Sequence, residues 1–96
     1  MELFIFARFH AREGREEALA TVLSDQLKFV RTEPGCISIA GFRSTRDPRQ
    51  FYFHSRWIDE AAFDVHAELP NTLQSLDRVQ VLIDHLLDVT RARPFG

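Results

Sequence analysis

The sequence has few of the residues on which metal centres, disulfide frameworks and charged interfaces depend. Cys36 is the only cysteine in 96 residues, which excludes an internal disulfide and any metal site built from paired cysteines. Twelve basic and fourteen acidic residues give a formal net charge of −2, and both signs are mixed along the chain. No surface of one charge is therefore expected to bind nucleic acid or an anionic membrane.

The chain also lacks segments that would direct it into or across a membrane. No apolar run approaches the roughly 20 residues that span a bilayer. The N-terminus has neither the basic segment nor the small-residue cleavage site of a secretory signal. Together with the single cysteine, these absences predict a cytoplasmic protein with no membrane partner.

The length predicts one domain, residues 1–96. A domain of this size buries only about 60 to 65% of the surface that its unfolded chain exposes, so its core is thin. A second copy of the chain would be the simplest addition to that core.

Two predicted strands, residues 3–9 and 51–57, carry aromatic side chains on both faces. The first places Leu3, Ile5, Ala7 and Phe9 on one face, with Phe4 and Phe6 on the other. The second places Phe51, Phe53 and Trp57 on one face, with Tyr52, His54 and Arg56 on the other. An antiparallel sheet with one wet face normally alternates apolar with polar residues, so both faces of this sheet need a cover.

The segment after the first strand predicts an amphipathic helix. Gly14 is its expected start, and Glu16 and Glu17 lie in the first turn, where the helix dipole favours negative charge. Apolar residues then recur at three- and four-residue spacing: Leu19, Val22, Leu23, Leu27 and Val30. Pro34 and Gly35 end the helix, because proline cannot continue it and glycine can take the positive φ that often follows.

The remaining segments predict a hairpin, two short helices and a last strand. Residues 36–43 form the first strand of the hairpin, with Asp47-Pro48 in its turn. Asp59 is the expected N-cap of the next helix, and Leu69-Pro70 interrupts it. Residues 86–92 form the fourth strand.

The resulting order, β-α-β-β-α-α-β, predicts an α+β fold of the ferredoxin-like type, with helices on one face of a four-stranded antiparallel sheet. The other face would then be covered by a second copy, which predicts a homodimer with a barrel-like arrangement of the two sheets.

Several short motifs in this order resemble the antibiotic biosynthesis monooxygenase family, whose members are dimeric α/β barrels. The resemblance runs nearly end to end. Its motifs are Gly14 before Glu16-Glu17-Ala18-Leu19, then Glu33-Pro34-Gly35-Cys36, Asp47-Pro48, and Trp57-Ile58-Asp59-Glu60-Ala61-Ala62-Phe63 followed by His66.

The resemblance implies oxidation by O₂ without flavin or metal, because an electron-rich phenolate or quinol can itself reduce oxygen. We therefore expect no cofactor, and a small aromatic quinol or polyphenol as substrate. The family also contains haem-degrading members and members with no established reaction, so an alternative stays open: a non-catalytic dimeric protein that binds a small ligand or haem. The sequence does not decide whether the chain is an enzyme.

His66 is the candidate catalytic residue, since its imidazole can take a proton from a phenol near neutral pH. It lies three residues after Phe63, so both can share the inward side of their helix. Trp57 could form a wall of the pocket. The alternative for His66 is a hydrogen-bonded structural histidine, and for Trp57 it is core packing.

His54 and Arg43, on the hairpin strands, are candidates for binding an anionic oxygen of the substrate. Their alternative is an ion pair at a dimer interface or an exposed strand end. His10 and His85 are expected to be isolated and solvated, and the four dispersed histidines do not form a metal motif.

Haem-degrading members pair the matching Trp and His with an Asn on the first strand. The matching position in this chain is about Ala7, and Asn71 is the only asparagine. The resemblance therefore favours the quinol-oxidising branch over haem degradation.

Overall fold

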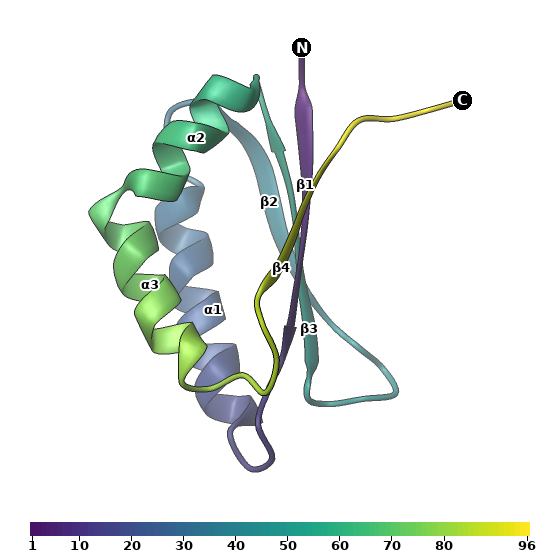
Figure 1. Ribbon diagram of the computed structural model, residues 1–96, viewed down its shortest axis with the longest axis vertical. Coiled ribbons are helices and arrows are strands. Elements are labelled where there is room, and N and C mark those ends of the chain that lie inside the picture. The colour runs from purple at the N-terminus through teal and green to yellow at the C-terminus, as the bar shows by residue number, and fades with distance from the viewer.

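A computed structural model describes residues 1–96 as a four-stranded sheet covered on one face by three helices (Figure 1). The elements follow the predicted order: β1 (Leu3–His10), α1 (Glu16–Val30), β2 (Cys36–Arg43), β3 (Gln50–Trp57), α2 (Glu60–Glu68), α3 (Pro70–Gln80) and β4 (Asp88–Ala92). All paired strands are antiparallel, in the order β2-β3-β1-β4. The predicted α+β, ferredoxin-like fold is confirmed. No helix is both long and apolar enough to cross a bilayer.

The ends of the helices follow from local chemistry. Asp59 caps α2, because its carboxylate accepts a hydrogen bond of 2.8 Å from the backbone N–H of Ala62. Pro70 occupies the first turn of α3, where its missing N–H costs nothing, and so it separates α3 from α2. Gly35 has a φ of +85°, which lets the chain turn sharply from α1 into β2.

Two predicted boundaries were wrong by two residues. Helix α1 begins at Glu16 and not at Gly14, because Gly14 has a φ of +79° that a right-handed helix does not allow. The last strand begins at Asp88 and not at residue 86, because its pairing with β1 starts at the Arg8–Asp88 pair. Leu86 instead lies in the α3–β4 loop and is 92% exposed.

The core between sheet and helices consists of two clusters of buried side chains. One lies where β1 and β3 meet α1 and the end of α3, and its larger members are Phe9, Leu19, Leu23, Phe51 and Leu82. The other lies toward the start of β1 and consists of Leu3, Ile5, Val30, Ile39 and Trp57. Phe53, partly buried, packs against both clusters.

The opposite face of the sheet is uncovered and aromatic. Phe6 on β1, Phe42 on β2 and Tyr52 on β3 are 51%, 56% and 42% exposed. Phe6 lies opposite His54 in the β1–β3 pairing, and Phe42 lies opposite Tyr52 in the β2–β3 pairing, so these side chains share one face. We call this surface the open face; its large apolar area is typical of an interaction surface.

Candidate functional site

A cavity of ≈ 100 Å³ lies between the sheet and the helices. Hydrophobic side chains from both core clusters form most of its wall, including Ile5, Ala7, Phe9, Ile39, Phe63 and Val79. Four polar side chains, Gln26, Ser55, Thr72 and Ser75, complete the wall. A mostly apolar wall with a few placed polar groups is the usual composition of a small-molecule site.

Three aromatic residues predicted from the sequence come together at one end of this cavity. The ring of His66 lies 4.8 Å from that of Trp57 and 5.4 Å from that of Phe63, and the Trp57 and Phe63 rings are 5.5 Å apart. Trp57, at the end of β3, is completely buried. Phe63 and His66 lie one turn apart on α2, whose start is fixed by the Asp59 cap.

His66 is paired with a carboxylate that sequence reasoning did not single out. Its Nδ1 lies 2.6 Å from Oε1 of Glu33 in the α1–β2 turn, and both side chains are almost buried. Since an ionised carboxylate only accepts hydrogen bonds, Nδ1 carries the hydrogen and donates it. This contact holds the imidazole in one orientation, as carboxylates do for catalytic histidines. The signal in the sequence was the Glu33-Pro34-Gly35 segment, which predicted the end of a helix and carried part of the family resemblance but gave no role to the Glu33 side chain.

His66 and Trp57 reach the cavity through hydroxyl groups and do not line it themselves. Oγ1 of Thr72 lies 3.4 Å from Nδ1 of His66, and Thr72 is part of the cavity wall. Trp57 Nε1 donates a hydrogen bond of 3.0 Å to Oγ of Ser55, which also lines the cavity. Of the predicted site residues, Phe63 alone contacts the cavity directly.

The two other predicted site residues lie elsewhere. His54 is on the open face, where its ring is 4.8 Å from that of Phe6. Arg43 is at the far end of β2, where Nη2 donates to Glu17 at 2.8 Å and its guanidinium lies 4.8 Å from the Phe51 ring centre. The hydrogen bond between Arg43 and Glu17 raises the pKa of Arg43 and lowers the pKa of Glu17. The structure therefore does not bring His54 and Arg43 to the cavity.

The expectation that His10 and His85 are isolated was wrong. Both ring nitrogens of His10 face carboxylates, Nε2 at 2.8 Å from Asp47 and Nδ1 at 3.0 Å from Asp84. His85 Nδ1 lies 3.3 Å from Asp84 as well. These residues come from the end of β1, the β2–β3 turn and the α3–β4 loop, which are distant in sequence, so spacing along the chain gave no signal.

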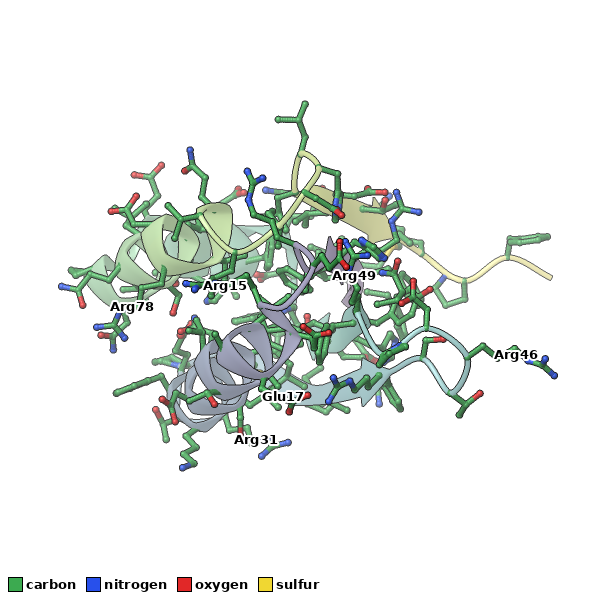
Figure 2. All side chains as sticks on the ribbon, turned by 90° about the horizontal axis from the view of Figure 1, so that it is seen from below. Arg15, Glu17, Arg31, Arg46, Arg49 and Arg78 are labelled. Atoms are coloured by element: carbon green, nitrogen blue, oxygen red, sulfur yellow. The ribbon has the colours of Figure 1, made fainter.

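Arg49 completes this group, which we call the His10 cluster: His10, Asp47, Arg49, Asp84 and His85. Arg49 turns back against the body of the protein, whereas Arg46 at the hairpin tip extends away from it (Figure 2). Arg49 Nη2 donates to Asp84 at 3.0 Å and Nε to the Ala11 carbonyl at 2.9 Å. The carboxylates are occupied by these contacts, and no group of His, Cys, Asp and Glu side chains is arranged to hold a metal ion.

The pKa values in the His10 cluster shift in the directions that these contacts require. Only the charged imidazolium has two N–H donors, so hydrogen bonds to Asp47 and Asp84 raise the pKa of His10. The backbone N–H of Arg49 and the His10 ring lower the pKa of Asp47. The pKa of Asp84 is also lowered, first by its hydrogen bond with His10.

Comparison with known proteins agrees with this arrangement of sheet, helices and cavity. Residues 3–75 match the family described as antibiotic biosynthesis monooxygenase. Because the match covers most of the chain, the protein belongs to this family. No curated protein matches it.

Several solved structures share the whole fold. Rv0793 from Mycobacterium tuberculosis is 25% identical, with a TM-score of 0.92 over 100% of this chain and 97% of that one. Protein SO0527 from Shewanella oneidensis is 26% identical, with a TM-score of 0.86 over 95% of this chain and 90% of that one. PA3566 from Pseudomonas aeruginosa is 23% identical, with a TM-score of 0.90 over 99% and 95% of the two chains, and supports the fold alone.

Proposed function

We propose that this protein is a cofactor-independent monooxygenase that oxidises a small aromatic quinol or polyphenol with O₂. The observation that carries the proposal is the His66–Glu33 pair, which is joined through Thr72 to a mostly apolar cavity. In such a reaction one oxygen atom enters the ring. The other leaves as water with two hydrogen atoms of the substrate, which supplies all of the electrons.

In this proposal the protein removes a proton and keeps the reacting anion dry. His66 takes the hydroxyl proton of the substrate on Nε2, the ring nitrogen that carries no hydrogen, and Glu33, which accepts the Nδ1 hydrogen, stabilises the imidazolium that forms. The Thr72 hydroxyl, on the cavity wall beside Nδ1, binds the substrate oxygen. Phe63 and the other apolar side chains exclude water, which strengthens the interaction of the phenolate with the polar wall. Trp57 fixes the Ser55 hydroxyl by a hydrogen bond and packs against the His66 ring. His54 and Arg43 take no part in binding in this proposal.

The direct test is oxygen uptake by the purified protein with a panel of quinols, catechols and anthrone-like phenols, measured against autoxidation without protein. We expect His66→Ala to lower the uptake above autoxidation by roughly 10²- to 10⁴-fold, the usual contribution of a general base. Glu33→Gln should lower it less. Glu68→Ala, on the exposed side of the same helix, is the matched control and should leave uptake unchanged. Equal uptake by His66→Ala and the native protein would refute the role of His66.

The alternative is a non-catalytic protein that binds a small aromatic ligand in the same cavity, and the separation of His66 from the cavity wall favours it. It predicts binding without oxygen uptake for every compound in the panel. Haem is a poorer fit, because it is larger than the compounds of the panel and would require a greater enlargement of the ≈ 100 Å³ cavity. The absence of a Soret band after addition of haem would exclude it.

We also propose that the protein works as a homodimer formed through the open face. The fold of this family is typically dimeric. The half-exposed rings of Phe6, Phe42 and Tyr52 would be removed from water by a second copy of the same surface.

A further inference from the structure

A larger hollow adjoins the cavity at the end of α3. We call it the α3–β4 groove; its volume is ≈ 350 Å³, and it is lined by Leu76, Val79, Gln80, Ile83, His85, Leu86 and Leu87. Leu76, Val79 and Leu87 also line the cavity, so the two spaces share a wall. The cavity alone is smaller than ordinary ligand pockets, whereas the groove falls within their range of about 300 to 1,000 Å³.

His85 is the ionisable residue of the groove, and its ring has an unused nitrogen. Nε2 is buried and has no hydrogen-bond partner. A buried polar atom without a partner is rare and calls for an explanation. The other ring nitrogen, Nδ1, lies 3.3 Å from Oδ1 of Asp84.

The Asp84 contact decides which kind of partner Nε2 can take. Asp84 also receives hydrogen bonds from Arg49 and His10, so it is a carboxylate that only accepts. Nδ1 of His85 therefore carries a hydrogen, and in the form of the ring that has one hydrogen Nε2 is an acceptor. The partner of this form of the ring is a donor, such as a hydroxyl group.

We propose that the α3–β4 groove extends the cavity and holds the hydroxyl-bearing end of a flat aromatic ligand, with His85 Nε2 accepting the hydrogen bond of this hydroxyl. The class of ligand rests on the proposed function, but the hydrogen bond to His85 does not depend on turnover. His85 would act as a specificity residue that distinguishes phenols from ethers and hydrocarbons of the same shape.

Because Nε2 is buried, the proposed hydrogen bond requires a side chain of the groove to move when the ligand binds. Leu86 is 92% exposed, so its movement would transfer little further apolar surface into water. Asp84 is held by His10 and Arg49, and its contact with Nδ1 fixes that side of the His85 ring.

The test compares the binding of 2-naphthol with that of 2-methoxynaphthalene, which has the same rings but no donor. Binding is measured by calorimetry to native protein and two variants. His85→Asn can keep a donor toward Asp84 but has no atom at the position of Nε2. His85→Gln can place an amide oxygen there. We expect native protein and His85→Gln to prefer the naphthol by about three- to tenfold, the contribution of one hydrogen bond, and His85→Asn to bind both compounds equally.

A measurement on the native protein keeps the test independent of how the variants fold. The ¹⁵N resonance of His85 Nε2 should move on addition of 2-naphthol and not on addition of 2-methoxynaphthalene. Equal binding of the two compounds by native protein, no binding of either, or an unchanged preference in folded His85→Asn would each overturn the proposal. Failure of oxygen uptake with an intact naphthol preference would refute the proposed oxygenase activity and leave this site standing.

Discussion

His10, at the end of β1, makes its contacts with two loops depend on pH. Its two ring nitrogens link Asp47 in the hairpin turn to Asp84 in the α3–β4 loop, and Arg49 and His85 also contact Asp84. Arg8 lines the same surface hollow as His10. Because the folded protein raises the pKa of His10, the stability from this group is complete below the unfolded value of 6.5 and is lost as the pH rises through the folded value.

The carboxylates set the lower limit of this pH window. The pKa values of Asp47 and Asp84 are lowered from 3.8, so their contribution is present above that value and is lost as the pH falls through the folded pKa values. The cluster therefore stabilises the fold most between pH 3.8 and pH 6.5.

We expect His10→Gln to be destabilised most within this window, because glutamine can donate a hydrogen bond but carries no charge. Urea unfolding should show a larger loss of unfolding free energy at about pH 5.5 than at about pH 8.5, where native His10 is less charged. A loss that is equal at both pH values would mean that the charge of His10 contributes nothing.

The histidines also show what residue-level sequence reasoning can reach. Phe63 and His66 were predicted to share the inward side of a helix, and Trp57 was predicted to form a wall of the pocket. The partner of His66, Glu33, lies 33 positions away and comes near only when the α1–β2 turn packs beside α2. His54 was misplaced for a different reason. Strand alternation placed His54 and Trp57 on different faces of the sheet, but nothing in the sequence indicated which face held the cavity.

At the scale of elements, the α1–β2 turn and α2 fit together with almost no space between them. A Cβ atom built on Gly35 would lie 2.6 Å from Cβ of Ala62 on α2, and Gly35 has a positive φ. Gly14 has a similar φ of +79°, but nothing lies within 4 Å of the corresponding position. An alanine at Gly14 would therefore cost only the strained backbone conformation, whereas an alanine at Gly35 would cost this strain and a steric clash as well.

Gly14→Ala should lower the unfolding free energy by about 1 to 2 kcal/mol, the cost of a left-handed conformation for an L-residue. Gly35→Ala should cost roughly 1 to 3 kcal/mol more, because α2 must shift to accept the added methyl group. Chemical denaturation of the two variants measures the difference. Equal losses of unfolding free energy in the two variants would show that α2 shifts to accept the methyl group at no energetic cost.

The elements themselves were largely predictable, since each carries its own signal in a short window. Apolar spacing predicted α1, the Asp59 cap and Pro70 predicted the two short helices, and alternation predicted the strands. The errors at Gly14 and Leu86 arose at ends, where the conformation of one glycine or the pairing with β1 decides the boundary.

For the whole molecule, the open face predicts how the chain associates. Light scattering of the native protein at micromolar concentration should give twice the chain mass of 11.1 kDa. Phe6→Glu should give a monomer, because a charge would be buried between two sheets. Phe29→Glu on α1 is a matched control, since Phe29 and Phe6 are both 51% exposed, and it should remain dimeric. A dimer in both variants would place the interface elsewhere.

The division of the core into two clusters has a consequence for finding the ligand. The cavity draws its wall from both clusters, so a bound aromatic ring would fill the space between them and complete the interior. Such a compound binds the folded chain and not the unfolded one, and at a hundred times its Kd it adds about 2.7 kcal/mol of stability.

In a domain of this length that gain corresponds to a rise of roughly 10 to 20 °C in melting temperature. The physiological ligand can therefore be sought by heating the protein with a chemical library and following its unfolding, without knowing the reaction. Compounds that raise the melting point then become the first substrates to offer it with oxygen.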